Sequence, residues 1–161
     1  FAQGGDDADG GVSRRVFGSF LGWLQERRGD VFVVATSNDV SKLPPEFIRK
    51  GRFDEVFFVD LPVPAVRESI FGIHLKRRKQ LPEKFDLPKL AQAADGFSGA
   101  EIEESVVAGL FSAFSANAPL STEMLLAEIG KTRPLALTMT EKIGELRAWA
   151  QDRTVMADQQ S

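Results

Sequence analysis

The sequence predicts a partial α/β region over residues 1–62, an all-helical domain over residues 63–152 and a short tail over residues 153–161. Two short apolar runs rich in β-branched residues, at 31–36 and 56–59, are typical of strands buried in a parallel sheet. Beyond Pro64 the apolar residues instead recur at the spacing of an α-helix. The change of pattern places the domain boundary in the turn between residues 61 and 64.

The first region is predicted to open with an acidic loop and a helix. Residues 3–11 are rich in Gly and Asp, which indicates a flexible loop. Ser13 is a suitable N-cap for an amphipathic helix that continues to about residue 28. The first strand then ends at Ser37-Asn38-Asp39, and the stretch before the second strand has room for a turn or two of helix.

The second region is predicted to hold five helices. The first begins at Pro64 and closes in a basic run, which complements the negative end of the helix dipole. A short helix follows Asp86, and Ser98 and Glu101 have the spacing of a capping box before a longer one. Two more helices are expected near 122–129 and 139–151, and the polar tail beyond them is expected to fray.

Composition excludes several classes of function. The 161 residues are 43% hydrophobic and 27% charged, with a net charge of 20 − 23 = −3, which argues against a non-specific nucleic-acid binder. Cysteine is absent and histidine occurs once, so no thiolate or multi-histidine metal site is expected in the chain. No apolar run approaches the ~20 residues that cross a bilayer, and no signal peptide opens the chain. We therefore expect a cytoplasmic protein without a membrane partner.

Three polar residues of the first region suggest phosphate chemistry. Asn38 follows a predicted strand at the edge where open α/β sheets bind ligands, although an Asn-Asp pair taken alone more often only starts a turn. Arg49 and Arg52 carry guanidinium groups, which suit phosphate oxygens. An isolated surface pair of arginines is usually a solvated charge cluster, so the pair alone is weak evidence.

The order of these residues is more specific than any one of them. The segment VFVVATSNDVSKLPPEFIRKGRFDEVFFVDLP resembles the second region of homology of the AAA ATPases. The segments IFGIHLKRR and FDLPKLAQAADGFSGAEIEESVVAGL resemble the helical lid of that family. Over residues 11–150 the chain most resembles the carboxyl-terminal half of an AAA family that is found in bacteria and encoded in some plastid genomes. The implied fold is part of a P-loop NTPase (AAA) sheet followed by the AAA lid.

The resemblance implies roles for residues of the first region. Asn38 matches the sensor that aligns the attacking water and reads the γ-phosphate, and Arg49 and Arg52 match arginine fingers that reach the neighbouring subunit's nucleotide. The acidic loop at 3–11 resembles a segment that faces the central pore. Pro44 departs from the family pattern, which often has Asp there.

In the second region the resemblance implies contacts with the nucleotide. His74 matches the position beside the ribose and adenine, and Gly99-Ala100 matches the lid turn against the base. A lone histidine on an apolar helix face is, however, more often a packing residue. Ala100 stands where many other ATPases of the superfamily place a second sensor arginine, whose absence is normal for the AAA branch.

ATP and Mg²⁺ are the implied cofactors, bound mainly by residues outside this chain. The P-loop pattern G-x-x-x-x-G-K-[ST] does not occur, because Leu125 occupies the first glycine position before Gly130-Lys131-Thr132. No hydrophobic run ending in Asp-Glu is present either. Since the first residue is Phe1, we expect the chain to be part of a longer protein that supplies both elements.

The resemblance implies an ATP hydrolase that works as a homo-oligomeric ring, a hexamer, and remodels a protein substrate. The chain alone is expected to be inactive. The alternative is a non-enzymatic assembly or binding module of the same fold, which would not need Asn38 and the arginine pair. A membrane-bound AAA protease is disfavoured because one histidine cannot supply a His-Glu-x-x-His zinc site.

The implied fold also makes a prediction about the sheet. The P-loop strand of the family lies between the two strands predicted here, so each would lose a neighbour. Unpaired buried backbone groups cost about 1–3 kcal/mol each. We expect the two strands to pair with each other, to be completed by a second copy, or to need a partner, and we expect the chain to self-associate.

Overall fold

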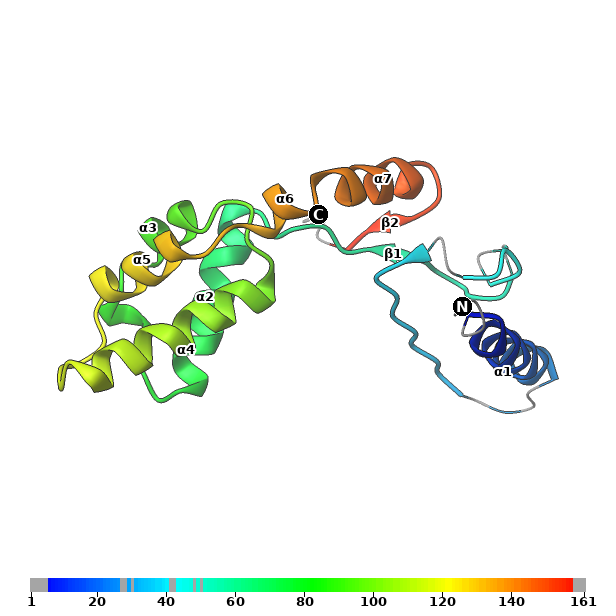
Figure 1. Cartoon of the computed structure of the whole chain (residues 1–161), viewed down its shortest axis with the longest axis horizontal. Coiled ribbons are helices and arrows are strands. Elements are labelled where there is room, and N and C mark those ends of the chain that lie inside the picture. Colours follow the sequence, from blue (N-terminus) through cyan, green and yellow to red (C-terminus); the bar gives the residue numbers. More distant parts are fainter. Residues whose placement is uncertain are drawn as a thin grey trace, which may run out of the picture. The chain divides into compact units, whose positions relative to one another are not determined.

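A computed structural model describes residues 6–26, 29, 31–40, 43–47, 49 and 51–157, with the backbone alone for 6–14. The chain divides into two compact units: unit 1 (Phe1–Phe57 and Arg153–Val155) and unit 2 (Phe58–Asp152 and Met156–Ser161). The elements, which Figure 1 labels except for η2, are α1 (Asp6–Glu26), β1 (Phe57–Phe58), α2 (Pro64–Arg77), the 3₁₀-helix η2 (Pro82–Lys84), α3 (Leu87–Ala93), α4 (Gly99–Ser115), α5 (Thr122–Lys131), α6 (Leu135–Thr138), α7 (Thr140–Ala150) and β2 (Val155–Met156).

The first helix begins earlier than the sequence indicated. Helix α1 already starts at Asp6, so most of the predicted acidic loop is helical and Ser13 lies inside the helix rather than at its N-cap. Residues 3–5 and the predicted helix end at 27–28 lie outside the described residues. The sequence DDAD at the start explains the difference, because acidic residues in the first turn favour a helix.

Aromatic side chains form the packing of unit 1. The Phe17 ring meets Phe47 edge-on at 5.0 Å between centroids, and Phe20 stacks on Phe47 at 5.9 Å. Trp23 stacks on Phe20 at 5.8 Å, one turn further along α1. Phe47 is buried. One face of α1 therefore packs against Phe47, which follows the turn at residues 43–45.

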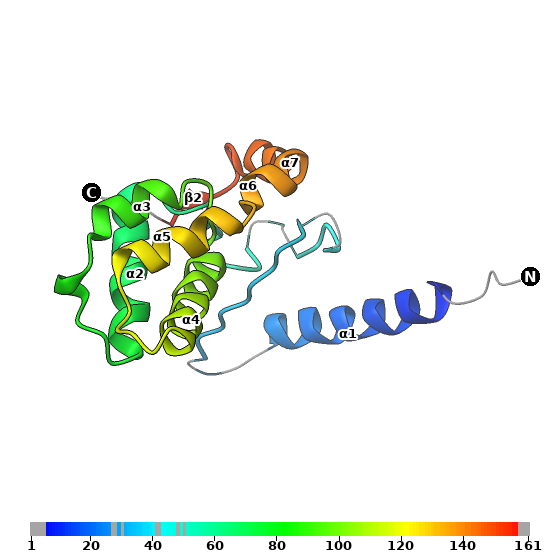
Figure 2. The ribbon, with the colours of Figure 1, turned by 60° about the vertical axis from the view of Figure 1, so that its left-hand side comes forward.

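The strand predicted at 31–36 is not formed. Residues 31–37 are extended, as Figure 2 shows, but they lie outside the two-stranded sheet of the described chain. Phe32 is 93% exposed and Val34 is 74% exposed, whereas the prediction had both faces buried. A parallel strand needs a neighbour of similar length and a layer on each face, and the described residues provide neither here.

The second predicted strand does form, with an unexpected partner. The backbone N–H of Val155 donates to Val56 O and that of Ala157 donates to Phe58 O, both at 2.9 Å, so β1 and β2 run parallel. Pairing between the two predicted strands, one of the three expected outcomes, is therefore not seen, and residues 155–157 of the tail are paired rather than frayed. Val155 and Met156 are apolar within that polar tail, and the long intervening chain supplies the crossover that parallel pairing requires.

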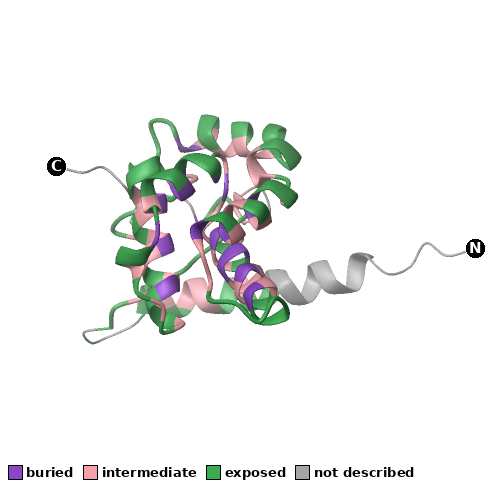
Figure 3. Ribbon diagram, turned by 90° about the vertical axis from the view of Figure 1, so that its left-hand side faces the viewer, coloured by how far each residue is buried: buried purple, intermediate pink, exposed green. Residues whose placement is uncertain are grey.

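Unit 2 is built around one apolar core enclosed by α2, α3, α4 and α5. Figure 3 colours the buried residues of the chain purple. The core residues are Phe71, Leu75, Phe85, Leu90, Ala94, Phe97, Ile102, Val106, Leu125 and Ile129. Eight of them form four pairs with four-residue spacing, which is the spacing of one helix face: Phe71 and Leu75, Leu90 and Ala94, Ile102 and Val106, and Leu125 and Ile129.

The predicted helix caps of unit 2 are confirmed. The Asp86 carboxylate accepts from the backbone N–H of Lys89 at 3.1 Å and begins α3. Ser98 and Glu101 form the capping box of α4, in which Glu101 Oε2 accepts from the Ser98 N–H at 2.6 Å. The other carboxylate oxygen of Glu101 accepts from the Leu135 N–H at 2.8 Å, which joins α4 to α6.

Two arginines hold the start of unit 2. Arg67 is buried and donates to the carbonyls of Ala91 and Pro62, both at 2.8 Å. Arg147 of α7 donates from Nε to Asp60 Oδ2 at 2.8 Å and from Nη2 to Asp60 Oδ1 at 3.0 Å. The hydrogen bond to this carboxylate raises the pKa of Arg147. Residues 60–62 are therefore fixed to the helices. Within the described chain, no helix has the length and apolar content needed to span a membrane.

Candidate functional site

Asn38 lies in a tight turn at the end of the extended segment. The Ser37 hydroxyl donates to Asp39 O at 3.1 Å and accepts from the Asp39 N–H at 3.2 Å. Serine and asparagine favour such turns because their side chains bond to nearby backbone. The turn reading of Asn38 is therefore correct as local structure, and the turn leaves the Asn38 residue exposed.

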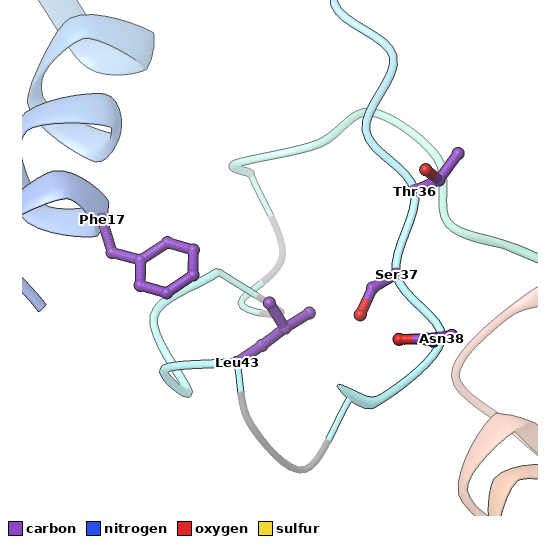
Figure 4. A pocket seen from close by; sticks show the side chains of 5 residues that line it. All are labelled: Phe17, Thr36, Ser37, Asn38 and Leu43. Carbon is purple, nitrogen blue, oxygen red and sulfur yellow. The ribbon is translucent and has the colours of Figure 1, made fainter. Parts of the chain in front are cut away.

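A cleft of ≈ 670 Å³ opens beside this turn. Its polar lining comes from Thr36, Ser37 and Asn38, and its apolar lining comes from Phe17 and Leu43 (Figure 4). The hydroxyl and amide groups can bond to water or to a phosphate oxygen. The described part of the lining carries no charged side chain, and its polar groups can orient such a ligand.

The two arginines of the predicted pair have different surroundings. Gly51 has φ +93°, a conformation that favours glycine, and the Arg52 N–H donates to Arg49 O at 3.3 Å across this turn. With its oxygen turned toward Arg52, the Gln25 amide of α1 lies 2.7 Å from Nη2. In that orientation Arg52 is held by a residue of its own unit, whereas Arg49 is exposed.

His74 lies in a charged cluster of unit 2. Its Nδ1 is 3.3 Å from Arg78 Nη1 and 3.4 Å from Glu103 Oε1, and Arg78 Nη2 donates to the same Glu103 oxygen at 2.8 Å. The hydrogen bond from Arg78 holds the pKa of Glu103 below its usual range. We call these three residues the His74 cluster. His74 is therefore more than a packing residue on an apolar face.

Gly99 and Ala100 form the first turn of α4. A Cβ on Gly99 would lie 3.8 Å from Ile70 Cδ1, an ordinary contact, so the space there does not itself require glycine. Ile70 precedes His74 by one turn of α2, and Glu103 follows Gly99 by one turn of α4. The beginning of α4 therefore packs against the turn of α2 that leads to His74.

The sequence-predicted site residues thus fall into two groups. Asn38, Arg49 and Arg52 lie in unit 1, and His74, Gly99 and Ala100 lie in unit 2. Sequence reasoning missed Arg78, Glu103 and Gln25. Arg78 could have been found from its spacing of four residues to His74, but the other two come from different helices.

The described residues offer no ready metal site. No group of three or more His, Asp or Glu side chains in the described ranges is placed to hold an ion.

Comparison with known proteins supports the resemblance seen in the sequence. Residues 1–61 match the model of the family described as ATPase family associated with various cellular activities (AAA). The AAA domain-containing protein ycf46 of Pyropia yezoensis is 48% identical over 145 residues, 89% of this chain and 30% of that protein. Its counterpart in Guillardia theta is 46% identical over 143 residues, 88% of this chain and 28% of that protein.

More distant relatives share part of the chain. A proteasome-activating nucleotidase of Archaeoglobus fulgidus is 35% identical over 113 residues, 67% of this chain and 28% of the nucleotidase. The chain spans less than a third of the length of each of these relatives.

Proposed function

Because the chain is homologous to AAA domain-containing proteins over nearly all of its length, we propose that it is the carboxyl-terminal part of an AAA ATP hydrolase. The observation that supports this most is the similarity over 145 residues, 89% of the chain, a length that takes in parts of both units. Unit 2 would then be the helical lid of that hydrolase.

Unit 1 would supply the residues that act on the terminal phosphate. Asn38 stands exposed at the cleft, where its amide can orient a water molecule. Arg49 is exposed and can reach a neighbouring subunit, whose transition-state charge it would stabilise as an arginine finger. Arg52, held through Gln25, would keep the arginine turn in place and add a second positive charge.

Unit 2 would bind the nucleoside end of ATP. His74 would lie beside the ribose and adenine, and the Gly99-Ala100 turn would lie against the base. The packing of this turn on Ile70, next to His74 along α2, supports a common site. ATP and Mg²⁺ would be held mainly by a P-loop and acidic residues that this sequence does not contain, and Mg²⁺ would screen the phosphate charge.

The partners follow from the arginine fingers and from the family. A finger that acts in trans requires neighbouring copies of the protein, and we propose that these copies form a homo-hexameric ring. The ring would use ATP hydrolysis to remodel a protein substrate. A cytoplasmic location stays a prediction. The 161-residue chain alone would neither hydrolyse ATP nor bind it tightly, because the P-loop supplies most of the phosphate contacts in such enzymes.

Mixing variants of the intact parent tests this proposal. Arg49→Ala should lower ATP turnover by about 10³–10⁵. Combining Arg49→Ala subunits with subunits that lack the P-loop lysine should restore part of the activity, because intact fingers would then face intact nucleotide sites. Arg133→Ala, which removes an exposed arginine of unit 2, should leave turnover unchanged. Mixtures as inactive as either variant would exclude action in trans, and a wild-type parent without ATPase activity would favour the non-enzymatic assembly module.

A further inference from the structure

One nitrogen of the His74 ring is paired and the other faces solvent. His74 is the only histidine of the chain, and its side chain is 12% exposed. Its Nδ1 lies against Arg78 and Glu103, while Nε2 has no hydrogen-bond partner in the described part of the chain. No buried side-chain nitrogen or oxygen among the described residues is left without a partner. Nε2 therefore keeps some contact with solvent.

The neighbours of Nδ1 determine where the ring proton lies. Arginine only donates, so the Arg78 Nη1–H at 3.3 Å requires a lone pair on Nδ1 of the neutral ring. The Glu103 oxygen, 3.4 Å from Nδ1, already accepts from Arg78 Nη2 at 2.8 Å. A proton on Nδ1 would point at a guanidinium hydrogen. The arrangement therefore favours the neutral tautomer that carries its proton on Nε2.

Arg78 is itself fixed by the end of α2. Its Nη1 also lies 3.3 Å from the carbonyl oxygen of His74, one of the last carbonyls of the helix. The guanidinium thus contacts the backbone and ring of His74 through one nitrogen and Glu103 through another. A lysine ammonium, a compact point charge without a planar fork, could not reproduce this bridge.

We propose that Arg78 is a positioning residue that sets the tautomer of His74, so that the exposed ring edge is a hydrogen-bond donor and selects a ligand with an acceptor there. This rests on the proposed function for the identity of the ligand, in which a ribose oxygen or a ring nitrogen of adenine is the acceptor. Protonation of the ring leaves the hydrogen on Nε2 in place, so the exposed edge remains a donor. Arg78 of α2 and Glu103 of α4 are the charged side chains that lie against Nδ1 of the ring.

The test uses the 161-residue chain without nucleotide. Long-range ¹H–¹⁵N correlation spectra of the ring report the tautomer directly, and with one histidine the signals need no further assignment. At a pH where the ring is neutral, we expect the Nε2–H form in the wild type. In Arg78→Met the proton should move to Nδ1, where Glu103 accepts it, so most of the population should shift to the Nδ1–H form.

Two variants control this result. Arg77→Met removes the exposed neighbouring arginine and should leave the tautomer as in the wild type. In Arg78→Met/Glu103→Ala the acceptor is also lost, so the Nε2–H form should return. A wild-type ring with its proton on Nδ1, or an Arg78→Met ring with the wild-type tautomer, would overturn the proposal. If Arg78→Met loses its helical circular dichroism, Glu103→Ala decides: it should keep the Nε2–H form, and a change to Nδ1–H would equally overturn the proposal.

Failure of the proposed function gives a different result. The expected tautomer shift in the chain, together with His74 signals that ATP does not move in the intact parent, would support the positioning role of Arg78. The same result would show that His74 does not contact the nucleotide.

Discussion

The extended segment of unit 1 and the helical core of unit 2 use apolar residues in opposite ways. In unit 2, Phe71 and Ile102 are completely buried because four helices close around them. In unit 1, Phe32 is 93% exposed and Val34 is 74% exposed, although both belong to a run that is as apolar as a core strand. A helix satisfies its own backbone and needs only packing, whereas a strand also needs a neighbour to pair with. Local sequence can therefore complete a helical unit but not a sheet.

The largest expected difference concerns two phenylalanines. Phe71→Ala should lower the free energy of unfolding of unit 2 by about 3–5 kcal/mol, because it leaves a cavity in the core. Phe32→Ala removes the same side chain from an exposed position and should change the stability of unit 1 by less than about 0.5 kcal/mol. Urea unfolding followed by tryptophan fluorescence measures both values.

The two tryptophans make this comparison possible, since Trp23 lies in unit 1 and Trp149 in unit 2. A Trp23→Phe background reports unit 2, and a Trp149→Phe background reports unit 1. If Phe32→Ala destabilised unit 1 as strongly as Phe71→Ala destabilises unit 2, residues 31–36 would be buried in solution, for instance by a second copy. We expect light scattering to show self-association of the chain, and this measurement would then tell whether a second copy covers residues 31–36.

The second prediction concerns two glycines of unit 2. Gly96 has φ +74°, and a Cβ there would lie 2.8 Å from Ala136 Cβ, so Gly96→Ala should cost about 1–3 kcal/mol. Gly130 lies in α5, and a Cβ there would meet no atom within 4 Å, so Gly130→Ala should stabilise by about 0.4–1 kcal/mol. Thermal unfolding followed by circular dichroism measures both. Equal effects of the two substitutions would contradict the close approach of Gly96 to α6.

The same contrast explains how much the sequence could predict. The caps at Asp86 and Ser98 were predictable because each bond spans three residues. The pairing of Val155 with Val56 was not, because about a hundred residues separate the two strands and the apolar pair in the tail is short. The start of α1 was misread because glycines near its beginning resemble a loop more than a helix.

The candidate site shows the same limit. The turn at Asn38 and the glycine turn at Gly51 follow from local residue types, which favour these backbone conformations. The bond from Arg52 to Gln25 and the contact of His74 with Glu103 depend on how separate segments pack. Sequence alone therefore predicted the candidate residues but not the side chains that fix them.

The third prediction compares two serines. Ser98→Ala removes the capping box of α4 and should cost unit 2 about 0.5–2 kcal/mol. Ser37→Ala removes a hydroxyl bonded to the Asp39 backbone in an exposed turn of unit 1, and we expect less than about 0.5 kcal/mol. Urea unfolding in the two single-tryptophan backgrounds measures each effect. A larger cost for Ser37→Ala would mean that its turn stabilises unit 1 more than a helix cap stabilises unit 2.

The smallest expected effect is a pH dependence confined to unit 2. The pKa of Glu103 is lowered, chiefly by its hydrogen bond from Arg78, so the folded state binds a proton there less readily than the unfolded chain. Its contribution to stability is therefore fully present above the unfolded pKa of about 4.3 and is lost as the pH falls through the lower folded value.

Glu103→Gln should flatten the acid side of the unit 2 stability curve. Glu104→Gln, at the exposed neighbouring position, should leave the slope as in the wild type. If both variants kept the wild-type slope, the ion pair with Arg78 would add nothing to folding, and the tautomer of His74 would remain the only measurable consequence of that contact.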